Sequence, residues 1–381
     1  MDRGLGGAPL KPLPEVRLPM TNSVRDRVSS VVIDCLQYCN WSEEIFAQLQ
    51  AGGVHAIHVT VAYHEDFRQT VDNLAAWNEW FAKYSQFILP GRSADDVVEA
   101  QASGRTAVFF GLQNCTPIED DLGLISILHN LGIRFMQLSY NHVGPLATGW
   151  VDEDKDEGIT ALGRAAIAEM NRVGLVIDMS HSAERSTLEA IDISSRPIAI
   201  SHANPKSWCG TGRNKSDAVL RALAARGGML GFSLYPRHLE GGSNCTLENF
   251  CAMVARSADL IGPEHLGIGS DLCQDQPDAV VRWMRTGTWV ADEDPNDDPK
   301  ADDPNADGAI RFPEQPSWFR SNLDMPGIAK ALRKTGFSEG EVSGIMGMNW
   351  LRLFRSSFEP AASGLGASDG APALSDPHTA A

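Results

Sequence analysis

Two histidines, two aspartates and a glutamine in this 381-residue sequence each follow a short apolar run. They are Asp34, Gln113, His181, His202 and Asp271, and each stands where a buried parallel strand would end. Imidazoles bind divalent ions, the bound ion lowers the pKa of a water molecule, and a nearby carboxylate takes the proton of that water. The joint pattern therefore predicts a metal-dependent hydrolase.

Each of these residues alone is weak support for a site. A histidine at a strand end is more often hydrogen-bonded in a core than bound to a metal, Asp34 could cap a helix, and Gln113 is a poor zinc ligand. What favours a site is the placement of both histidines and Asp271 at the same end of the inferred strands. We expect the other histidines considered to have packing or surface roles: His55, His58, His129 and His265.

Eight strand-like apolar runs alternate with helical patterns over about 240 residues, which predicts a (β/α)8 barrel of the metal-dependent, amidohydrolase-like type. An open doubly wound sheet is the alternative, but no glycine-rich dinucleotide fingerprint or phosphate loop supports it. A barrel would gather its reactive groups at the carboxyl ends of its strands. The eight runs are residues 31–34, 56–61, 106–112, 135–138, 175–179, 197–201, 229–234 and 266–270.

The flanks of the chain differ in composition from this repeating part. We expect an N-terminal extension over residues 1–23, the barrel over 24–358 and a disordered tail over 359–381, with an acidic insertion at 291–307 after the last strand. The first twenty residues contain no apolar stretch of the secretory type, which predicts a cytoplasmic protein. No run of eighteen apolar residues occurs, so we expect no membrane span.

The formal charge of −17 argues against nucleic acid as a partner. The 291–307 segment alone holds eight acidic residues and one lysine, so much of that charge lies in one predicted insertion. A weaker hypothesis makes this segment a docking site for a basic partner. The seven cysteines are odd in number and widely spread, which favours free thiols.

Four stretches, in order and at matching spacing, resemble the membrane (renal) dipeptidase family over roughly residues 24–355. They are residues 174–181, 197–202, 212–217 and 267–271. The resemblance, to a divergent bacterial-type member with an altered metal site, implies a (β/α)8 hydrolase. Such enzymes hold two zinc ions and cleave dipeptides, often tolerating a D-residue on the carboxyl side.

Carried over by residue, the resemblance assigns His181 and His202 to the second metal site and Asp271 to the catalytic carboxylate. It also assigns Arg213 to the carboxylate of the substrate, a role that suits a planar bidentate donor. Without the family, a surface ion pair would be an equal explanation for this arginine.

The sequence departs from the family at the first metal site. The family's Asp-Gly-His-x-Asp stretch becomes residues 34–38, with Leu36 and Tyr38 in place of the ligands, and Gln113 replaces the bridging glutamate. An amide cannot supply the negative charge that holds two cations close together. Tyr140 stands where some members have a substrate-binding histidine, and we expect it to line the pocket with Asn141.

The sequence thus predicts a cytoplasmic hydrolase with one zinc ion that cleaves a dipeptide or related small amide bearing a carboxylate. Gln113 and Asp34 are lesser candidate ligands. Two alternatives stay open: a barrel that has lost hydrolysis and binds a small molecule, or soft metal ligands supplied by Cys35, Cys39, Cys115 or Cys273. A homodimer is a further expectation, since aromatic residues 77, 80 and 81 suit either an interface or a helix core.

Overall fold

The structure is a computed structural model that describes residues 30–287 and 312–358. The predicted extension at 1–23, the acidic insertion at 291–307 and the tail at 359–381 lie outside the described residues. No described helix is long and apolar enough to cross a membrane. The cytoplasmic location and the domain boundaries stay predictions.

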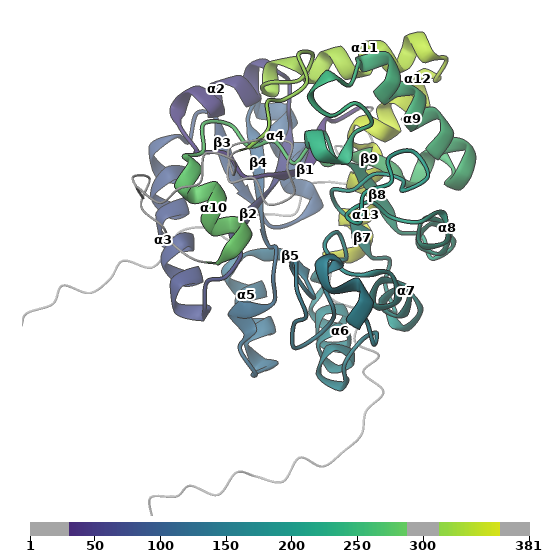
Figure 1. The fold of residues 1–381 in the computed structure, drawn as a ribbon. Helices are drawn as coiled ribbons and strands as arrows, with labels where there is room; N and C mark the ends of the chain where they lie inside the picture. Colours follow the sequence, from purple (N-terminus) through teal and green to yellow (C-terminus); the bar gives the residue numbers. More distant parts are fainter. Residues whose placement is uncertain (1–29, 288–311, 359–381) are drawn as a thin grey trace, which may run out of the picture.

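Eight parallel strands close into a barrel, which confirms the predicted (β/α)8 fold (Figure 1). Closure comes from β9 pairing with β1 and from β2 pairing with both β1 and β4. The barrel strands are β1 Ile33–Gln37, β2 Ala56–Ala62, β4 Thr106–Leu112, β5 Ile133–Gln137, β6 Val176–Asp178, β7 Ala199–Ile200, β8 Met229–Phe232 and β9 Leu266–Ile268.

A ninth strand, β3 (Ile88–Gly91), lies outside this closed ring. It pairs with the first half of β4, from Thr106 to Phe109, while the second half of β4 pairs with β5. Because β2 takes the other edge of β4, β3 and β5 share one edge. The sequence does not predict β3, because only three apolar residues precede Pro90 and proline argues against a ladder position.

Twelve described helices surround the strands (Figure 1). Six of them begin at a serine, threonine or aspartate whose side chain accepts from the third backbone N–H of the helix, a common start signal. The helices are α2 Glu43–Ala51, α3 Phe67–Lys83, α4 Ala94–Ser103, α5 Gly123–Leu131, α6 Ala161–Val173, α7 Glu184–Ile193, α8 Asp217–Ala225, α9 Leu247–Ile261, α10 Asp278–Thr286, α11 Met325–Thr335, α12 Glu339–Ser343 and α13 Asn349–Ser357.

The aromatic residues of α3 pack into the fold. Trp77 is buried in the main core, and Trp80 and Phe81 pack against that core. These rings therefore pack within the protein and do not support the expected homodimer. The homodimer stays a prediction.

Helix α13 closes the amino-terminal end of the barrel. Trp350 is fully buried, its indole N–H donates to the carbonyl of Ile268 (2.9 Å), and Phe354 packs on Phe109 and Phe135. A Cβ on Gly267 would lie 2.2 Å from the indole nitrogen, so only glycine leaves room for this ring. The base is filled with side chains, which leaves the carboxyl ends of the strands as the open end of the barrel.

We expect replacement of Trp350 by alanine to lower the free energy of unfolding by about 3–5 kcal/mol, because it empties the largest buried side-chain site in the base. Urea denaturation followed by circular dichroism measures the loss. Leu323→Ala is the matched control, since Leu323 is 52% exposed and should cost little. Equal losses in both variants would show that α13 does not hold the base together.

Candidate active site

A cavity of 720 Å³ opens at the carboxyl ends of the barrel strands. Six of the eight predicted site residues line it: Gln113, Tyr140, Asn141, His181, Arg213 and Asp271. His202 is fully buried and reaches the cavity through its contact with His181, whereas Asp34 does not line it. The barrel topology thus brings together side chains that are up to 158 positions apart in the sequence (Gln113 to Asp271).

The hydrogen bonds of His181 fix which ring nitrogen carries its proton. Asn141 Oδ1 lies 2.9 Å from His181 Nδ1 and 3.0 Å from the indole nitrogen of Trp150. An indole N–H can only donate, so this atom of Asn141 is an acceptor and His181 Nδ1 must be the donor. The Nε2 atom of His181 is therefore unprotonated and presents a lone pair.

Hydrogen bonds also fix which ring nitrogen of His202 carries its proton. Its Nδ1 lies 2.7 Å from Ser201 Oγ, while the hydroxyls of Ser201 and Ser180 both donate to Asp178. The Ser201 oxygen must then accept from His202 Nδ1, which leaves the Nε2 lone pair of His202 free as well. The two Nε2 atoms lie 3.1 Å apart, so two lone pairs face each other.

A proton between the two rings is disfavoured. Burial holds the pKa of His181 and of His202 well below the usual range for histidine, and the positive charge of Arg213 lowers both further. Two neutral imidazoles, each held by a hydrogen bond at the other ring nitrogen, form the arrangement that binds a divalent ion. The two imidazoles therefore offer two ligands to one metal ion, one fewer than the three protein ligands usual at a catalytic zinc site.

The first metal position of the family does not fit an ion. Leu36 is fully buried and cannot coordinate, Tyr38 stands in place of the aspartate, and the amide nitrogen of Gln113 donates to Thr60 Oγ1 (2.8 Å). Within residues 30–287 and 312–358, no group of three or more His, Cys, Asp or Glu side chains is placed to hold a metal.

The cysteine alternative also finds no geometric support. In the described part of the chain, none of the four candidate cysteines lines the active-site cavity. Burial raises the pKa of Cys35 and Cys273 well above the usual value, and the thiolate is the form that binds metal.

Asp271 has a backbone conformation that is uncommon for a residue other than glycine, with φ at 60°. Its N–H donates to the carbonyl of Leu36 (3.0 Å), and its side chain lines the cavity. Burial raises the pKa of Asp271 to about 7; Asp34 raises it further, and Arg213 and Arg285 oppose the shift. Such a carboxyl group can exchange a proton near neutral pH.

Asp34 holds the loop that carries Asp271. Its carboxylate accepts from the backbone N–H and hydroxyl of Ser270 (2.6 and 2.5 Å) and from the side-chain amide of Gln37 (2.7 Å). With these donors, Asp34 connects the end of β1 to the segment that follows β9. Its predicted role as a lesser metal ligand gains no support.

Arg213 is 4% exposed and reaches the two loops that carry the histidines. Its guanidinium donates to the backbone carbonyl of Ser180 and to that of His202 (3.2 Å). Burial lowers its pKa to about 10, which leaves it charged at neutral pH. The residue therefore both positions the two histidines and presents positive charge to the cavity.

Lys215 is a second buried cation in this loop, also 4% exposed, and the sequence analysis did not single it out. Its Nζ donates to the carbonyl of Ser182, next to His181, at 2.5 Å. Burial lowers the pKa of Lys215 to about 7, and the nearby Arg213 charge adds to the shift.

We expect the stability of the metal-free protein to rise with pH through this lysine. Its pKa is lower in the folded than in the unfolded chain, so the unfolded chain binds more protons between about pH 7 and pH 10. Relative to Lys215→Met, the wild type should gain roughly 2 kcal/mol between pH 7 and pH 9. Urea denaturation at both pH values tests this, with the exposed Lys330→Met as control; parallel pH curves for all three proteins would contradict it.

Several cavity residues escaped the sequence analysis. His238 is buried and contacts Ser233 Oγ through Nδ1 (2.8 Å), and Arg285 of α10 donates to the hydroxyl of Tyr235 (2.8 Å). His238 stands six positions beyond the end of β8, and Arg285 lies on a helix far beyond β9. Neither residue directly follows a strand, so the pattern of polar residues at strand ends does not predict them.

Comparison with known proteins places this geometry in a family. A family model described as membrane dipeptidase (peptidase family M19) matches residues 41–282, beginning just after the altered 34–38 stretch. The crystal structure of an amidohydrolase from Pseudomonas aeruginosa is 30% identical, with a TM-score of 0.78 over 86% of this chain and 97% of that chain. A metallo peptidase from Rhodobacter sphaeroides, liganded with a phosphinate mimic of L-Ala-D-Ala, shares the fold at 17% identity and a TM-score of 0.68, over 86% of this chain and 100% of that chain.

Among curated relatives, the dipeptidase tcpJ of Claviceps purpurea is 26% identical over 312 residues, which cover 79% of this chain and 63% of that protein. The chain spans somewhat less than two thirds of the length of the curated relatives it matches. The family predicted from the sequence is confirmed, because the family model covers more than half of the chain and the P. aeruginosa structure aligns over nearly all of its own length. The chain belongs to the membrane dipeptidase family.

Proposed function

We propose that the chain is a hydrolase that uses one divalent ion, zinc, to cleave a dipeptide or a related small amide bearing a carboxylate. The observation that carries this proposal is the pair of facing Nε2 lone pairs on His181 and His202, 3.1 Å apart. An ion held there would polarise the scissile carbonyl group and lower the pKa of a water molecule.

The residues of the chain would supply proton transfer and orientation. Asp271 faces the same cavity, and we assign it the uptake of a proton from water and its delivery to the leaving amine. Asn141 would hold His181 in the required tautomer, and Tyr140 packs its ring on that of His181 (centroids 4.4 Å apart). Tyr140 and Asn141 also line the space for the substrate.

The charge of the cavity suits a substrate with a carboxylate. Among the residues that the structure describes, Arg213, Arg237 and Arg285 line it together with one carboxylate, that of Asp271. Two of the five N–H groups of Arg213 hold backbone carbonyls, and we assign the others to the substrate carboxylate. The site is thus locally positive although the chain carries −17.

A second function is favoured by the loss of the first metal position. With Leu36, Tyr38 and Gln113 in place of its ligands, the barrel could bind a small carboxylate without cleaving it. A screen separates the two functions: zinc-loaded protein is incubated with L,L- and L,D-dipeptides and with N-acyl amino acids, and release of free amine is measured. Turnover by the wild type that is absent in His202→Ala supports the hydrolase. Ligand binding without turnover across the panel would favour the binding protein.

A further inference from the structure

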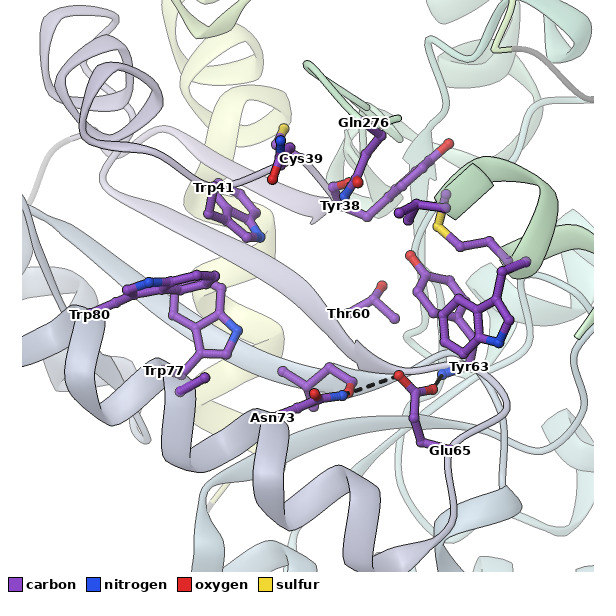
Figure 2. Close-up of a pocket in the computed structure, with 16 residues that line it drawn as sticks. Tyr38, Cys39, Trp41, Thr60, Tyr63, Glu65, Asn73, Trp77, Trp80 and Gln276 are labelled. Carbon is purple, nitrogen blue, oxygen red and sulfur yellow. Dashed lines mark hydrogen bonds between the residues drawn. The ribbon is translucent and has the colours of Figure 1, made fainter. Parts of the chain in front are cut away.

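A second cavity, of 240 Å³, lies beside the active site between the ends of β1 and β2, helix α3 and helix α10. We call it the aromatic cavity. Figure 2 shows Trp41, Trp77 and Trp80 on one side of it and Tyr63 on the other. Its wall toward the active-site cavity is shared, since Tyr38, Tyr63 and Met284 line both.

The aromatic cavity has one fixed charge. Among residues 30–287 and 312–358, Glu65 is its only acidic lining residue, and no lysine, arginine or histidine of these residues lines it. The Glu65 carboxylate accepts from the backbone N–H groups of Tyr63 (2.6 Å) and His64 (3.1 Å) and from the side-chain amide of Asn73 (3.1 Å). All three donors are neutral, so they fix the position of the carboxylate without cancelling its charge.

The cavity also contains a polar group that lacks a partner. Tyr63 is 7% exposed, and among the described residues its hydroxyl has no hydrogen-bond partner. Its ring is held by edge contacts with Tyr140 and Trp283, with centroids 5.8 and 5.9 Å apart. A buried hydroxyl without a partner is unfavourable, which is a reason to expect a ligand to satisfy it.

We propose that the aromatic cavity binds a small organic cation, an ammonium group with apolar substituents. Ring faces attract a cation, and Glu65 supplies the opposite charge at a fixed position. A bound anion would be repelled by the charge of Glu65, and a neutral apolar ligand would displace water from that carboxylate without supplying an opposite charge. The residues of this site are distinct from those assigned to hydrolysis, although an occupant would contact Tyr38 and Tyr63 in the wall shared by the two cavities.

The test uses the tryptophans of the cavity as reporters. Fluorescence of the full chain is titrated with choline, tetramethylammonium and phenethylammonium, and with 3,3-dimethylbutan-1-ol, the uncharged isostere of choline. We expect saturable changes with the cations and an affinity for choline at least about tenfold above that for the isostere. Equal affinities, or no saturable change with any of the three cations, would overturn the proposal.

Two variants locate the effect at the cavity. Glu65→Gln keeps an oxygen acceptor but removes the charge, so it should abolish the preference for choline, whereas Glu79→Gln, an exposed site on α3, should retain it. Tyr63→Phe should weaken binding of the primary ammonium, which can donate to the hydroxyl, and leave tetramethylammonium unchanged. Thermal melting checks that each variant is folded, and the wild-type comparison of choline with its isostere needs no variant. An unchanged preference in folded Glu65→Gln would contradict the assignment.

The ammonium group could belong to a free ligand or to the side chain of a substrate that spans both cavities. Competition with bound choline distinguishes these sources without requiring turnover. Displacement by glycyl-lysine but not by glycyl-norleucine assigns the cation to a substrate, and displacement by neither assigns it to a free ligand. Either result keeps the aromatic cavity as a cation site.

Discussion

Replacement of His202 by alanine is expected to remove the bound ion and hydrolysis together. His202 supplies one of the two Nε2 lone pairs, and among the described residues no group of three or more His, Cys, Asp or Glu side chains could hold the ion in its place. Altering groups that only support a metal ligand already weakens binding by 10- to 100-fold, so loss of a ligand should cost more than about 100-fold. Zinc titration of chelator-treated protein measures the affinity, and the dipeptide screen measures turnover.

His129→Ala is the control for this experiment. His129 lies on α5, does not line the cavity and should keep both the metal and the activity of the wild type. Thermal melting of His202→Ala shows whether the barrel remains folded. A folded His202→Ala protein with wild-type zinc affinity would mean that the ion, if there is one, binds elsewhere.

Replacement of Asp271 by asparagine is expected to lower kcat by about 10²- to 10⁴-fold, the range that a positioned acid or base contributes. We expect this substitution to leave the backbone conformation unchanged. Asparagine adopts positive φ about as readily as aspartate, so the backbone at φ 60° should not rearrange. The loss then reports on the carboxyl group itself and not on the loop that carries it.

Zinc content of Asp271→Asn should stay at the wild-type level, because His181 and His202 supply the metal site. Asp259→Asn, an exposed position on α9, controls for the loss of one negative charge. If Asp271→Asn turned over a substrate of the wild type at the same rate, the assignment of proton transfer to Asp271 would be wrong.

The fold was predictable because its signal is local and repeated. Each barrel strand is a short run of buried apolar residues, and each was visible in the sequence. Strand β3 was missed because it has few apolar residues and ends in Pro90-Gly91, where composition resembles a turn. Helix α13 closes the base through contacts of Trp350 and Phe354 with distant strands, which the apolar periodicity of the helix does not specify.

The site was predictable where a residue follows a strand end or stands in a stretch that resembles the family. His181, His202, Arg213 and Asp271 do converge on one cavity region, as expected from strand ends and from the family resemblance. The tautomers of the histidines depend on Asn141 and Ser201 together with their own partners, a network of side chains that sequence spacing cannot reveal.

The sequence also does not reveal the contacts of the two buried cations near the histidines. Lys215 lies two positions after Arg213, yet only the folded loop shows where both donate: Arg213 to the carbonyls of Ser180 and His202, and Lys215 to that of Ser182. The whole-chain charge of −17 says nothing about the cavity, whose described lining holds three arginines and one aspartate.

The central claim is that this member of the family holds one ion where the family pattern provides for two. The direct measurement is the zinc-to-protein ratio of chelator-treated protein reloaded with excess zinc and freed of loosely bound metal, determined by elemental analysis. We expect one zinc ion per chain in the wild type and none in His202→Ala. Two zinc ions per chain would contradict the loss of the first site at Leu36, Tyr38 and Gln113, and none would contradict the metal site at His181 and His202.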